Sequence, residues 1–347
     1  MKSFYNCSLF ENENFEITDS FVVKQEELLF KSSLSNNNIS FSKILVDYEC
    51  KWIEQKNWNN EKPTIIIPIK DNILLLEKTC LNLKKYQVNE ICNVIIVDDR
   101  SSDTIGIKEL SIKNDFSYLR VENKKGFNFS MLNNIAAFIC YKLGIKHIIL
   151  WNSDLWCAKT EFLTNILSKH IENNSVISGT KLVYPPIEMS MNKQEDSENI
   201  SFHFPNMKGK WRKTIQFGGG FWIDTTKTSL IAFSPMHYRR FKQLDDLLAN
   251  VDKTDSFVTG AFQIIDLNWF IKIGGLNPSL SKNFQDVDLC LRALEEKSKV
   301  FYFGKDIYFY HDESVSLIKE GKNDVQLYSD HALFAKIWNN KLLSLVL

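Results

Sequence analysis

Two short runs of β-branched residues, each closed by polar residues, limit most strongly what this chain can fold into. Residues 64–68 read TIIIP, and residues 94–97 read VIIV and lead into Asp98 and Asp99. Runs of this kind are typical of strands buried on both faces of a parallel sheet. Residues 74–86 between them have the apolar spacing of an amphipathic helix. The segment therefore predicts a βαβ unit with polar loops at the carboxyl ends of its strands.

The same pattern repeats further along the chain. Residues 116–121 and 147–151 predict a third and a fourth strand, and between them a helix capped by Ser130 ends at Gly144. Ligands of open α/β sheets bind at the carboxyl ends of the strands. We therefore expect an α/β protein with a Rossmann-like, mostly parallel central sheet flanked by helices, and a site in the loops after its strands.

Changes in character divide the chain into three parts. Residues 1–60 are rich in Asn, Glu, Lys and Phe, and we expect an N-terminal extension with one or two helices. Residues 61–320 form the main domain, in which about 180–255 loses the strand–helix alternation and predicts irregular structure. A strand is predicted again at 257–265. Residues 321–347 predict one C-terminal amphipathic helix.

Two later strands and two helices complete the expected domain. Residues 268–273 and a helix from Asp286 are predicted helical, and strands are predicted at 300–303 and 307–310.

Composition limits the partners and the compartment. Lysine plus arginine and aspartate plus glutamate each number 42, so no overall field favours nucleic acid. The seven cysteines are scattered without a Cys-x-x-Cys pair, which fits reduced thiols in the cytoplasm. No signal peptide is evident, and no apolar run reaches the roughly 18 residues of a membrane span. The glycine-rich motifs of dinucleotide oxidoreductases and P-loop enzymes are also missing.

Acidic residues follow two of the predicted strands. Asp154 stands among apolar residues, where a lone carboxylate needs a partner such as a divalent metal on a diphosphate. The alternative is an aspartate that caps a helix starting near Thr160. Asp98 and Asp99 are placed to accept hydrogen bonds from the base or ribose of a nucleotide, or else they form a turn.

The helix from Asp286 carries a second group of charges. Asp288 and Arg292 are spaced to form an i, i+4 pair, which leaves Asp286 in the first turn facing a cleft. There the helix dipole should lower its pKa, which makes it a weak base unless desolvation offsets the effect; the alternative is an acid that only stabilises the helix end. His311 ends an aromatic-rich strand, where a lone histidine is more often a hydrogen-bonded core residue than a ligand; its position soon after the acidic helix raises the odds of a ligand. The buried face of this helix should consist of Val287, Cys290, Leu291 and Leu294.

Two clusters of basic and aromatic residues, at 208–213 and 237–242, lie in the irregular region. They could meet an acidic acceptor or a membrane surface, and a solvated loop is the alternative.

Taken in order, these segments resemble the family 2 glycosyltransferases of the GT-A fold, particularly bacterial enzymes that build O-antigen, capsule and related surface glycans. The resemblance covers residues 63–317. Its landmarks are residues 65–68, 97–103, 126–134, 150–154, 259–262, 274–277 and 285–292 and the pattern His311-x-x-Ser314-x-Ser316.

The resemblance assigns roles to particular residues. It implies that Asp286 is the base, that Asp154 is the last position of a metal-binding Asp-x-Asp motif, and that His311 helps to hold the metal or diphosphate. Asn152 replaces the first aspartate of that motif, and Gln285 stands where a glutamate is common. The nucleotide-sugar donor is expected to contact Pro68, Lys70, Asp98, Asp99, Asn133, Asn152 and Ser153.

The implied activity is an inverting sugar transfer from a nucleoside-diphosphate sugar, a UDP-sugar in our prediction, with Mn²⁺ or Mg²⁺ as cofactor. The acceptor would be a hydroxyl of a glycan or lipid-linked glycan, bound on the side of residues 180–255. The enzyme would be cytoplasmic, with at most a peripheral contact with the inner membrane surface, and would bind no nucleic acid.

Two other classes stay open. A sugar nucleotidyltransferase should carry a glycine-rich loop with an arginine after its first strand, where residues 68–71 read PIKD. A catalytically silent glycan-binding protein would not need Asp154 or Asp286.

Overall fold

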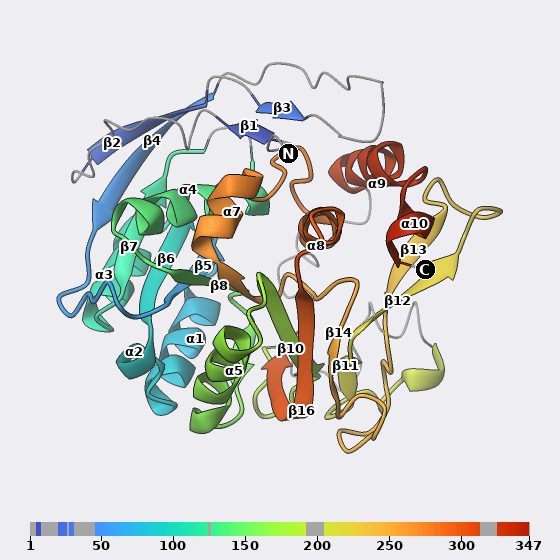
Figure 1. Ribbon diagram of the computed structural model, residues 1–347. Coiled ribbons are helices and arrows are strands. Elements are labelled where there is room, and N and C mark those ends of the chain that lie inside the picture. The colour runs from blue at the N-terminus through green and yellow to red at the C-terminus, as the bar shows by residue number, and fades with distance from the viewer. Residues whose placement is uncertain are drawn as a thin grey trace.

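The structure is a computed structural model that describes residues 5–7, 20–25, 28–30, 46–123, 126–191, 205–312 and 325–346. Its central strands are β5 (Thr64–Ile69), β6 (Asn93–Asp99), β7 (Ser117–Val121), β8 (His147–Trp151), β10 (Ile177–Val183), β15 (Phe262–Asp266) and β16 (Val300–His311). The outer strands are β2 (Ser20–Gln25), β4 (Val46–Ile53), β9 (Leu155–Cys157), β11 (Ile215–Phe217) and β14 (Asp252–Thr254). Together they form one 12-stranded sheet in the order β14-β16-β10-β15-β8-β5-β6-β7-β4-β2, with β11 beside β10 and β9 beside β16 (Figure 1).

The centre of the sheet is mostly parallel. β5 pairs in parallel with β6 and β8, and β6 pairs in parallel with β7. β15 runs antiparallel to β8 and β10, and β10 pairs in parallel with β16. Six of the seven central strands therefore point the same way, and the carboxyl ends of β5, β6 and β8 meet at one edge. The predicted α/β class with a mostly parallel central sheet is confirmed.

Helices cover both sides of these strands, which explains why every residue of β5 and β6 is buried. Figure 1 shows α1, α2, α3 and α5 on one side of the parallel strands and α4 and α7 on the other. The helices are α1 (Ile73–Lys85), α2 (Val88–Ile91), α3 (Thr104–Lys113), α4 (Phe129–Lys142), α5 (Thr160–Glu172), α7 (Leu267–Ile273), α8 (Gln285–Glu295), α9 (Val325–Trp338) and α10 (Leu342–Val346).

The predicted cap of α4 is wrong by two residues. Asn128 is the N-cap, because its side-chain oxygen accepts the backbone N–H of Met131 at 2.9 Å. Ser130 lies inside the helix, and its hydroxyl donates to the carbonyl of Leu280 at 2.6 Å. That bond ties α4 to the loop before α8.

The N-terminal part contains strands where one or two helices were predicted. Among its described residues, β1 (Tyr5–Cys7) pairs with β3 (Leu28–Phe30), and β2 and β4 extend the central sheet beyond β7. The reason is a period of two: Tyr48, Cys50 and Trp52 are buried while Glu49 and Lys51 are exposed. This alternation was present in the sequence and marks a half-buried strand. The boundary between extension and domain stays a prediction.

Three later elements also differ from prediction. The strand expected at 257–265 begins at Phe262, and the residues before it form a loop. β16 is one bent strand instead of two, with a register shift against β10 and a positive φ of 59° at Asp306. The C-terminal segment forms two helices, α9 and α10, where one was expected.

Among its described residues, the region predicted to be irregular contains only short elements after β10. These are the 3₁₀ helix η2 (Pro205–Met207), β11, β14 and a hairpin of β12 (Gly220–Asp224) and β13 (Phe233–His237). None of the helices among the described residues is long and apolar enough to cross a membrane. Six cysteines in these residues are free and buried, as predicted: Cys50, Cys80, Cys92, Cys140, Cys157 and Cys290.

Candidate active site

A pocket of about 470 Å³ opens at the carboxyl edge of the parallel strands. Its wall includes residues 68–72 after β5, residues 152–154 after β8, the loop 259–261 before β15, and residues 282–286 at the start of α8. Segments far apart in the sequence meet here because parallel strands bring their following loops to one edge. The pocket lies where the sequence predicts a ligand site.

Seven of the ten predicted site residues line this pocket, namely Pro68, Lys70, Asn152, Ser153, Asp154, Asp286 and His311. Asp98, Asp99 and Asn133 do not line it. Asp154 and Asp286, which stand 132 positions apart in the chain, therefore border the same cavity. Ser314 and Ser316 of the predicted histidine motif lie outside the described residues.

Strand pairing places Asp154 beside His311. β9 starts directly after Asp154 and pairs antiparallel with the end of β16, so that Leu155 is opposite His311. The backbone N–H of Asp312 also donates to the carbonyl of Asp154 at 3.0 Å. As a result, His311 Nε2 lies 3.2 Å from Asp154 Oδ1, and both residues are buried. Asp154 does not cap α5, whose N-cap is Lys159.

Two amide side chains flank the ring of His311. Its Nδ1 lies 2.8 Å from Oε1 of Gln216, and its Nε2 lies 3.3 Å from Nδ2 of Asn152. In the tautomer with the proton on Nδ1, that proton is donated to Gln216 and the Nε2 lone pair faces the carboxylate of Asp154.

Asp286 occupies the first turn of α8 and borders the pocket on another side. Its Oδ2 accepts the backbone N–H of Gly260 at 2.6 Å, and its Oδ1 accepts that of Val287 at 2.8 Å. Burial raises the pKa of Asp286 above its ordinary value, and these two N–H groups oppose the rise. The sequence-based expectation of a lowered pKa is wrong in direction, because desolvation outweighs the helix dipole and the N–H donors.

Gly260 allows this approach. A Cβ atom added at Gly260 would lie 2.9 Å from Cβ of Asp286, closer than two such atoms pack. The loop before β15 therefore needs a glycine at this position to touch the carboxylate.

The C-terminal helix α9 holds the segment that leads into Asp286. The carboxylate of Asp330 accepts backbone N–H groups of Lys282 at 2.9 Å and Asn283 at 3.0 Å, and a longer bond from Ser281 at 3.4 Å. Phe284, the N-cap of α8, has a positive φ of 62° and stacks on Phe334 with ring centroids 4.6 Å apart. Packing from α9 thus stabilises an unfavourable backbone conformation next to the site.

The other end of α8 is fixed by the predicted ion pair. Arg292 Nε donates to Asp288 Oδ2 at 3.0 Å with both side chains buried, and Trp338 of α9 donates to Asp288 Oδ1 at 3.0 Å. Of the predicted buried face, Val287, Cys290 and Leu291 are buried and Leu294 is half-buried.

Asp98 is engaged within the protein. Its Oδ2 accepts from the Tyr118 hydroxyl at 2.7 Å and from Arg120 at 2.8 Å, and its Oδ1 accepts the N–H of Ser101 at 2.9 Å. These bonds close the turn after β6 and fix the loop that follows. The turn interpretation of this residue is thus supported.

Asp99 does not line the pocket but contacts a residue that does. It forms an ion pair of 3.1 Å with Lys70, which lines the pocket. Burial raises the pKa of Asp99, and Lys70 opposes the rise. Asn133 is buried in α4 and donates to the carbonyl of Phe129, itself a pocket residue, at 2.8 Å.

Several pocket residues were not among the predicted site residues. Gln216 and His237 come from β11 and β13 in the irregular region, and His237 Nδ1 contacts the carbonyl of Gln216 at 3.2 Å. Phe127 and Phe129 add aromatic side chains. The phenylalanines lie within a segment singled out by the resemblance, whereas no spacing marks Gln216.

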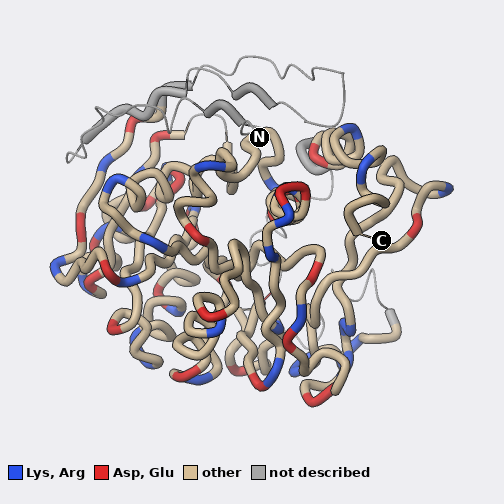
Figure 2. The backbone as a smooth tube through the Cα atoms, in the orientation of Figure 1, with Lys and Arg blue, Asp and Glu red and all other residues tan. Residues whose placement is uncertain are grey.

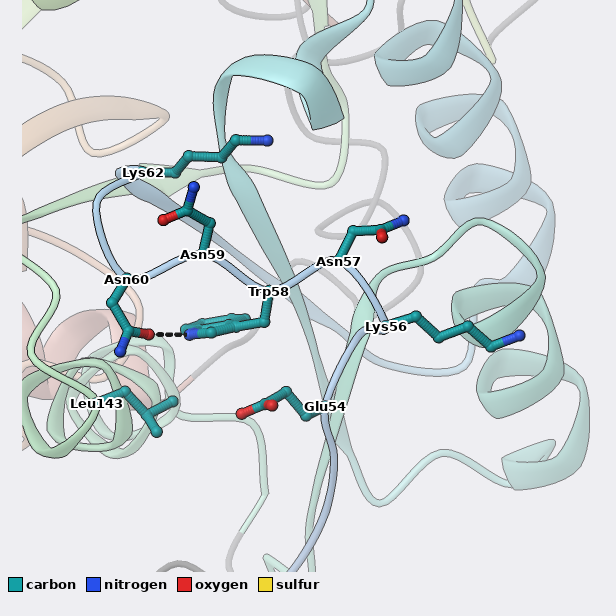
Figure 3. Close-up of a pocket in the computed structure, with 8 residues that line it drawn as sticks. All are labelled: Glu54, Lys56, Asn57, Trp58, Asn59, Asn60, Lys62 and Leu143. Atoms are coloured by element: carbon teal, nitrogen blue, oxygen red, sulfur yellow. Dashed lines mark hydrogen bonds between the residues drawn. The ribbon is translucent and has the colours of Figure 1, made fainter.

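A second hollow lies at the opposite edge of the sheet, in the segment between β4 and β5 (Figure 3). Several of its polar side chains have partners: Trp58 Nε1 donates to Asn60 at 2.7 Å, and Asn57 donates to Asp115 at 2.6 Å. None of the predicted site residues lines it. It is a hydrogen-bonded connecting loop, and we assign it no chemistry.

No family model and no curated protein matches the chain. Among solved structures, S. aureus TarS 1-349 is 13% identical, with 82% of this chain and 72% of that chain covered and a TM-score of 0.42. The mannosyltransferase PcManGT from Pyrobaculum calidifontis, in complex with GDP-Man and Mn²⁺, is 10% identical, with 83% and 72% covered and a TM-score of 0.44. TarS 1-349 in complex with UDP-GlcNAc is 13% identical, with 77% and 60% covered and a TM-score of 0.42. Similarities this low carry no argument about this chain, so the fold rests on its own topology.

The geometry defines a class of site. A carboxylate paired with an imidazole lone pair borders the pocket on one side, and a second carboxylate of raised pKa borders it on another. The first pair can hold a hard divalent cation, and the second can take a proton from a bound hydroxyl.

Proposed function

We propose that this protein is a GT-A glycosyltransferase that transfers a sugar from a nucleoside-diphosphate sugar to a hydroxyl of a glycan or lipid-linked glycan. The observation that carries the proposal is that the Asp154–His311 pair and Asp286 border one pocket at the carboxyl edge of the sheet. The predicted roles require this arrangement. If these residues lay on opposite sides of the molecule, they could not act on one substrate.

The metal expected from the resemblance fits the residues present. The Nε2 lone pair of His311 and the carboxylate of Asp154 are both acceptors at 3.2 Å, a contact that a cation between them would stabilise. No group of three or more His, Cys, Asp or Glu that could hold a metal occurs among the described residues. Asp154 and His311 would thus hold the ion together with water and diphosphate oxygens. One imidazole in the set favours Mn²⁺ over Mg²⁺.

When bound, such an ion supplies stabilisation of the negative charge that develops on the departing diphosphate. The protein's own part is to place the acceptor hydroxyl against Asp286. The acceptor oxygen bonds to the anomeric carbon, the bond from that carbon to the diphosphate oxygen breaks, and the acceptor proton passes to Asp286. A single displacement of this kind inverts the anomeric configuration.

The raised pKa of Asp286 suits this role. A base is most effective when its pKa lies near the working pH, and burial moves this carboxylate in that direction. Each carboxylate oxygen accepts one backbone N–H, which leaves a lone pair for the proton.

The finer assignments belong to the same proposal. We assign UDP as the nucleotide, contacts of Pro68, Lys70 and Ser153 with the donor, and a role in bacterial surface polysaccharide synthesis, in the cytoplasm or at the inner membrane surface. Asp98, Asp99 and Asn133 support the donor site indirectly. Asp98 fixes the loop after β6, Asp99 pairs with Lys70, and Asn133 donates to the carbonyl of Phe129. Family 2 membership is part of this proposal.

A panel of nucleotide sugars with Mn²⁺ tests the proposal, with release of the free nucleoside diphosphate as the readout. We expect release from one donor in the panel, and its loss in Asp286→Asn while calorimetry shows donor binding of nearly unchanged affinity. Asp224→Asn, an exposed aspartate at the end of β12, is the matched control. Full activity of Asp286→Asn would refute the assignment of the base.

The same experiment separates the alternatives. A sugar nucleotidyltransferase would form nucleotide sugar from sugar 1-phosphate and nucleoside triphosphate, with release of pyrophosphate. A silent glycan-binding protein would release no nucleotide from any donor.

A further inference from the structure

We propose that the acceptor carries negative charges and that a basic surface beside the pocket binds them. This surface, called here the basic rim, consists of residues 208–213 and 239–242. The inference rests on the proposed function and names the chemical class of its acceptor: a glycan with phosphate or carboxylate groups.

The basic rim begins where the pocket wall ends. Gln216 and His237 line the pocket. Residues 208–213 come shortly before Gln216 in the chain, and residues 239–242 come shortly after His237. Backbone bonds hold the segments together: Ile215 N–H donates to Lys242 O at 2.8 Å, and Phe241 N–H donates to Ile215 O at 2.7 Å. A chain bound in the pocket would therefore leave it across this surface.

Aromatic packing makes the rim a fixed platform. Tyr184 and Trp211 are buried in a small hydrophobic cluster of their own, against which Met207 and Phe241 pack. Tyr184 stacks on Phe241 with centroids 5.7 Å apart, and Arg240 donates to the Tyr184 hydroxyl from Nε at 3.0 Å. This cluster is separate from the main core and supports only this part of the molecule.

The rim has a local excess of positive charge. Residues 208–213 contain Lys208, Lys210, Arg212 and Lys213 and no acidic residue. Lys210, Lys213 and Lys242 are exposed and form no ion pair with any residue that the structure describes. The whole chain is neutral, and Figure 2 shows both signs of charge spread over most of the backbone. The excess is therefore a property of this surface.

The absence of exposed apolar side chains favours a glycan over a membrane. A membrane-binding surface combines cations with exposed large hydrophobic residues. Within the rim itself, residues 208–213 and 239–242, no large hydrophobic side chain is exposed, whereas Met236 and Phe221 of the neighbouring hairpin are 37% and 36% exposed. Leu247 and Leu248 are exposed nearby but lie outside the rim, and Asp246 before them is paired with Arg239 of the rim.

The test measures binding of the full-length protein to four probes at several salt concentrations: alginate for carboxylates, inorganic polyphosphate for phosphates, neutral dextran, and vesicles of phosphatidylglycerol and phosphatidylcholine. We expect binding to alginate or polyphosphate at least about tenfold tighter than to dextran, because affinity for a charged polymer comes largely from counterion release. The stronger of the two identifies the charged group.

The triple variant Lys210→Gln, Lys213→Gln, Lys242→Gln should lose about tenfold or more of this affinity. Its plot of log affinity against log salt should be shallower by about two. The matched control is Lys84→Gln, Lys108→Gln, Lys113→Gln, which removes three exposed lysines from α1 and α3. Thermal unfolding of both variants verifies folding.

Two results would overturn the proposal: equal polyanion binding by the triple variant and the wild type, or binding to anionic vesicles without binding to either polyanion. Calorimetry of the wild type with UDP and Mn²⁺ is run in parallel. Polyanion binding without UDP binding would reject a UDP-dependent transferase and leave the anion-binding surface standing, so the two failures are distinguishable.

Discussion

His311 Nε2 and Asp154 Oδ1 lie 3.2 Å apart, and both atoms are hydrogen-bond acceptors in the tautomer that donates its Nδ1 proton to Gln216. Two buried acceptors at this distance are unfavourable unless a proton or metal ion lies between them. The pair also joins the two halves of the sheet, since Asp154 follows β8 and His311 ends β16. Gln216, which belongs to the irregular region, contacts Nδ1 of His311. The structure therefore connects the expected acceptor side to the metal pair through one side chain.

Gln216 should control metal affinity without touching the metal. In Gln216→Leu the Nδ1 proton loses its acceptor, so His311 can adopt the other tautomer and turn its N–H toward Asp154. We expect Mn²⁺ affinity in the presence of UDP to fall about 10- to 100-fold, the usual effect of removing a group that orients a ligand. Electron paramagnetic resonance of free Mn²⁺ measures it.

Gln216→Glu keeps an acceptor at Nδ1 and should restore most of that affinity. Asp154→Ala removes a ligand and sets the lower limit. A merely structural role of Gln216 predicts similar losses in the leucine and glutamate variants, and that result would reject the positioning role.

The pH dependence of transfer should report the raised pKa of Asp286. Only the ionised carboxylate accepts a proton, so the rate rises as pH increases through the pKa of the group. Because burial raises that pKa, the acidic limb of kcat/KM should lie above the range of an ordinary aspartate, near 3.9. A limb centred at the ordinary value would show that another group limits the rate.

Gly260→Ala tests whether contact with the loop before β15 sets the position of Asp286. The added methyl group would lie 2.9 Å from Cβ of Asp286 and must displace it. A displacement of about 1 Å costs roughly 100-fold in rate, so we expect that loss in kcat with donor affinity retained. Gly144→Ala, at a positive φ of 78° and with no atom within 4 Å of the added methyl group, strains the backbone far from Asp286 and shows what destabilisation alone does to kcat. Unchanged kcat in Gly260→Ala would show that the contact is dispensable.

The parallel half of the sheet and its ligand edge could be predicted because their signals are local. The run at 64–68 and the polar residues after it are adjacent in sequence, and the parallel topology then brings such loops together. Asp154 and His311 were found in this way. The direction of the pKa shift of Asp286 was not predicted correctly. Burial of this carboxylate depends on the packing of Gly260 and the pocket wall, which no local pattern records.

The remaining residues depend on contacts between distant segments. Gln216 stands 95 positions before His311, and Asp330 stands 47 positions after Asn283. A single glutamine in an irregular region and an aspartate on a terminal helix are common on protein surfaces. Only the folded chain shows that both are buried against the site.

Asp330 should couple the C-terminal helix to the pocket, and truncating it tests this. Asp330→Ala leaves the half-buried backbone N–H groups of Lys282 and Asn283 without the carboxylate that accepts them. Each unsatisfied buried donor costs about 1–3 kcal/mol, although a water molecule that fills the space recovers part of this. We expect a decrease of about 2–3 kcal/mol in the free energy of unfolding by urea. Donor affinity should also fall, because Lys282 and Asn283 line the pocket.

Lys336→Ala is the matched control, since Lys336 is exposed on the same helix. It should change neither quantity. A loss of stability in Asp330→Ala with unchanged donor affinity would mean that the loop keeps its shape without the carboxylate, and that α9 stabilises the fold without shaping the site. A loss of both, absent in Lys336→Ala, would show that the conformation of the loop leading to Asp286 is imposed by α9 and not by the loop's own sequence.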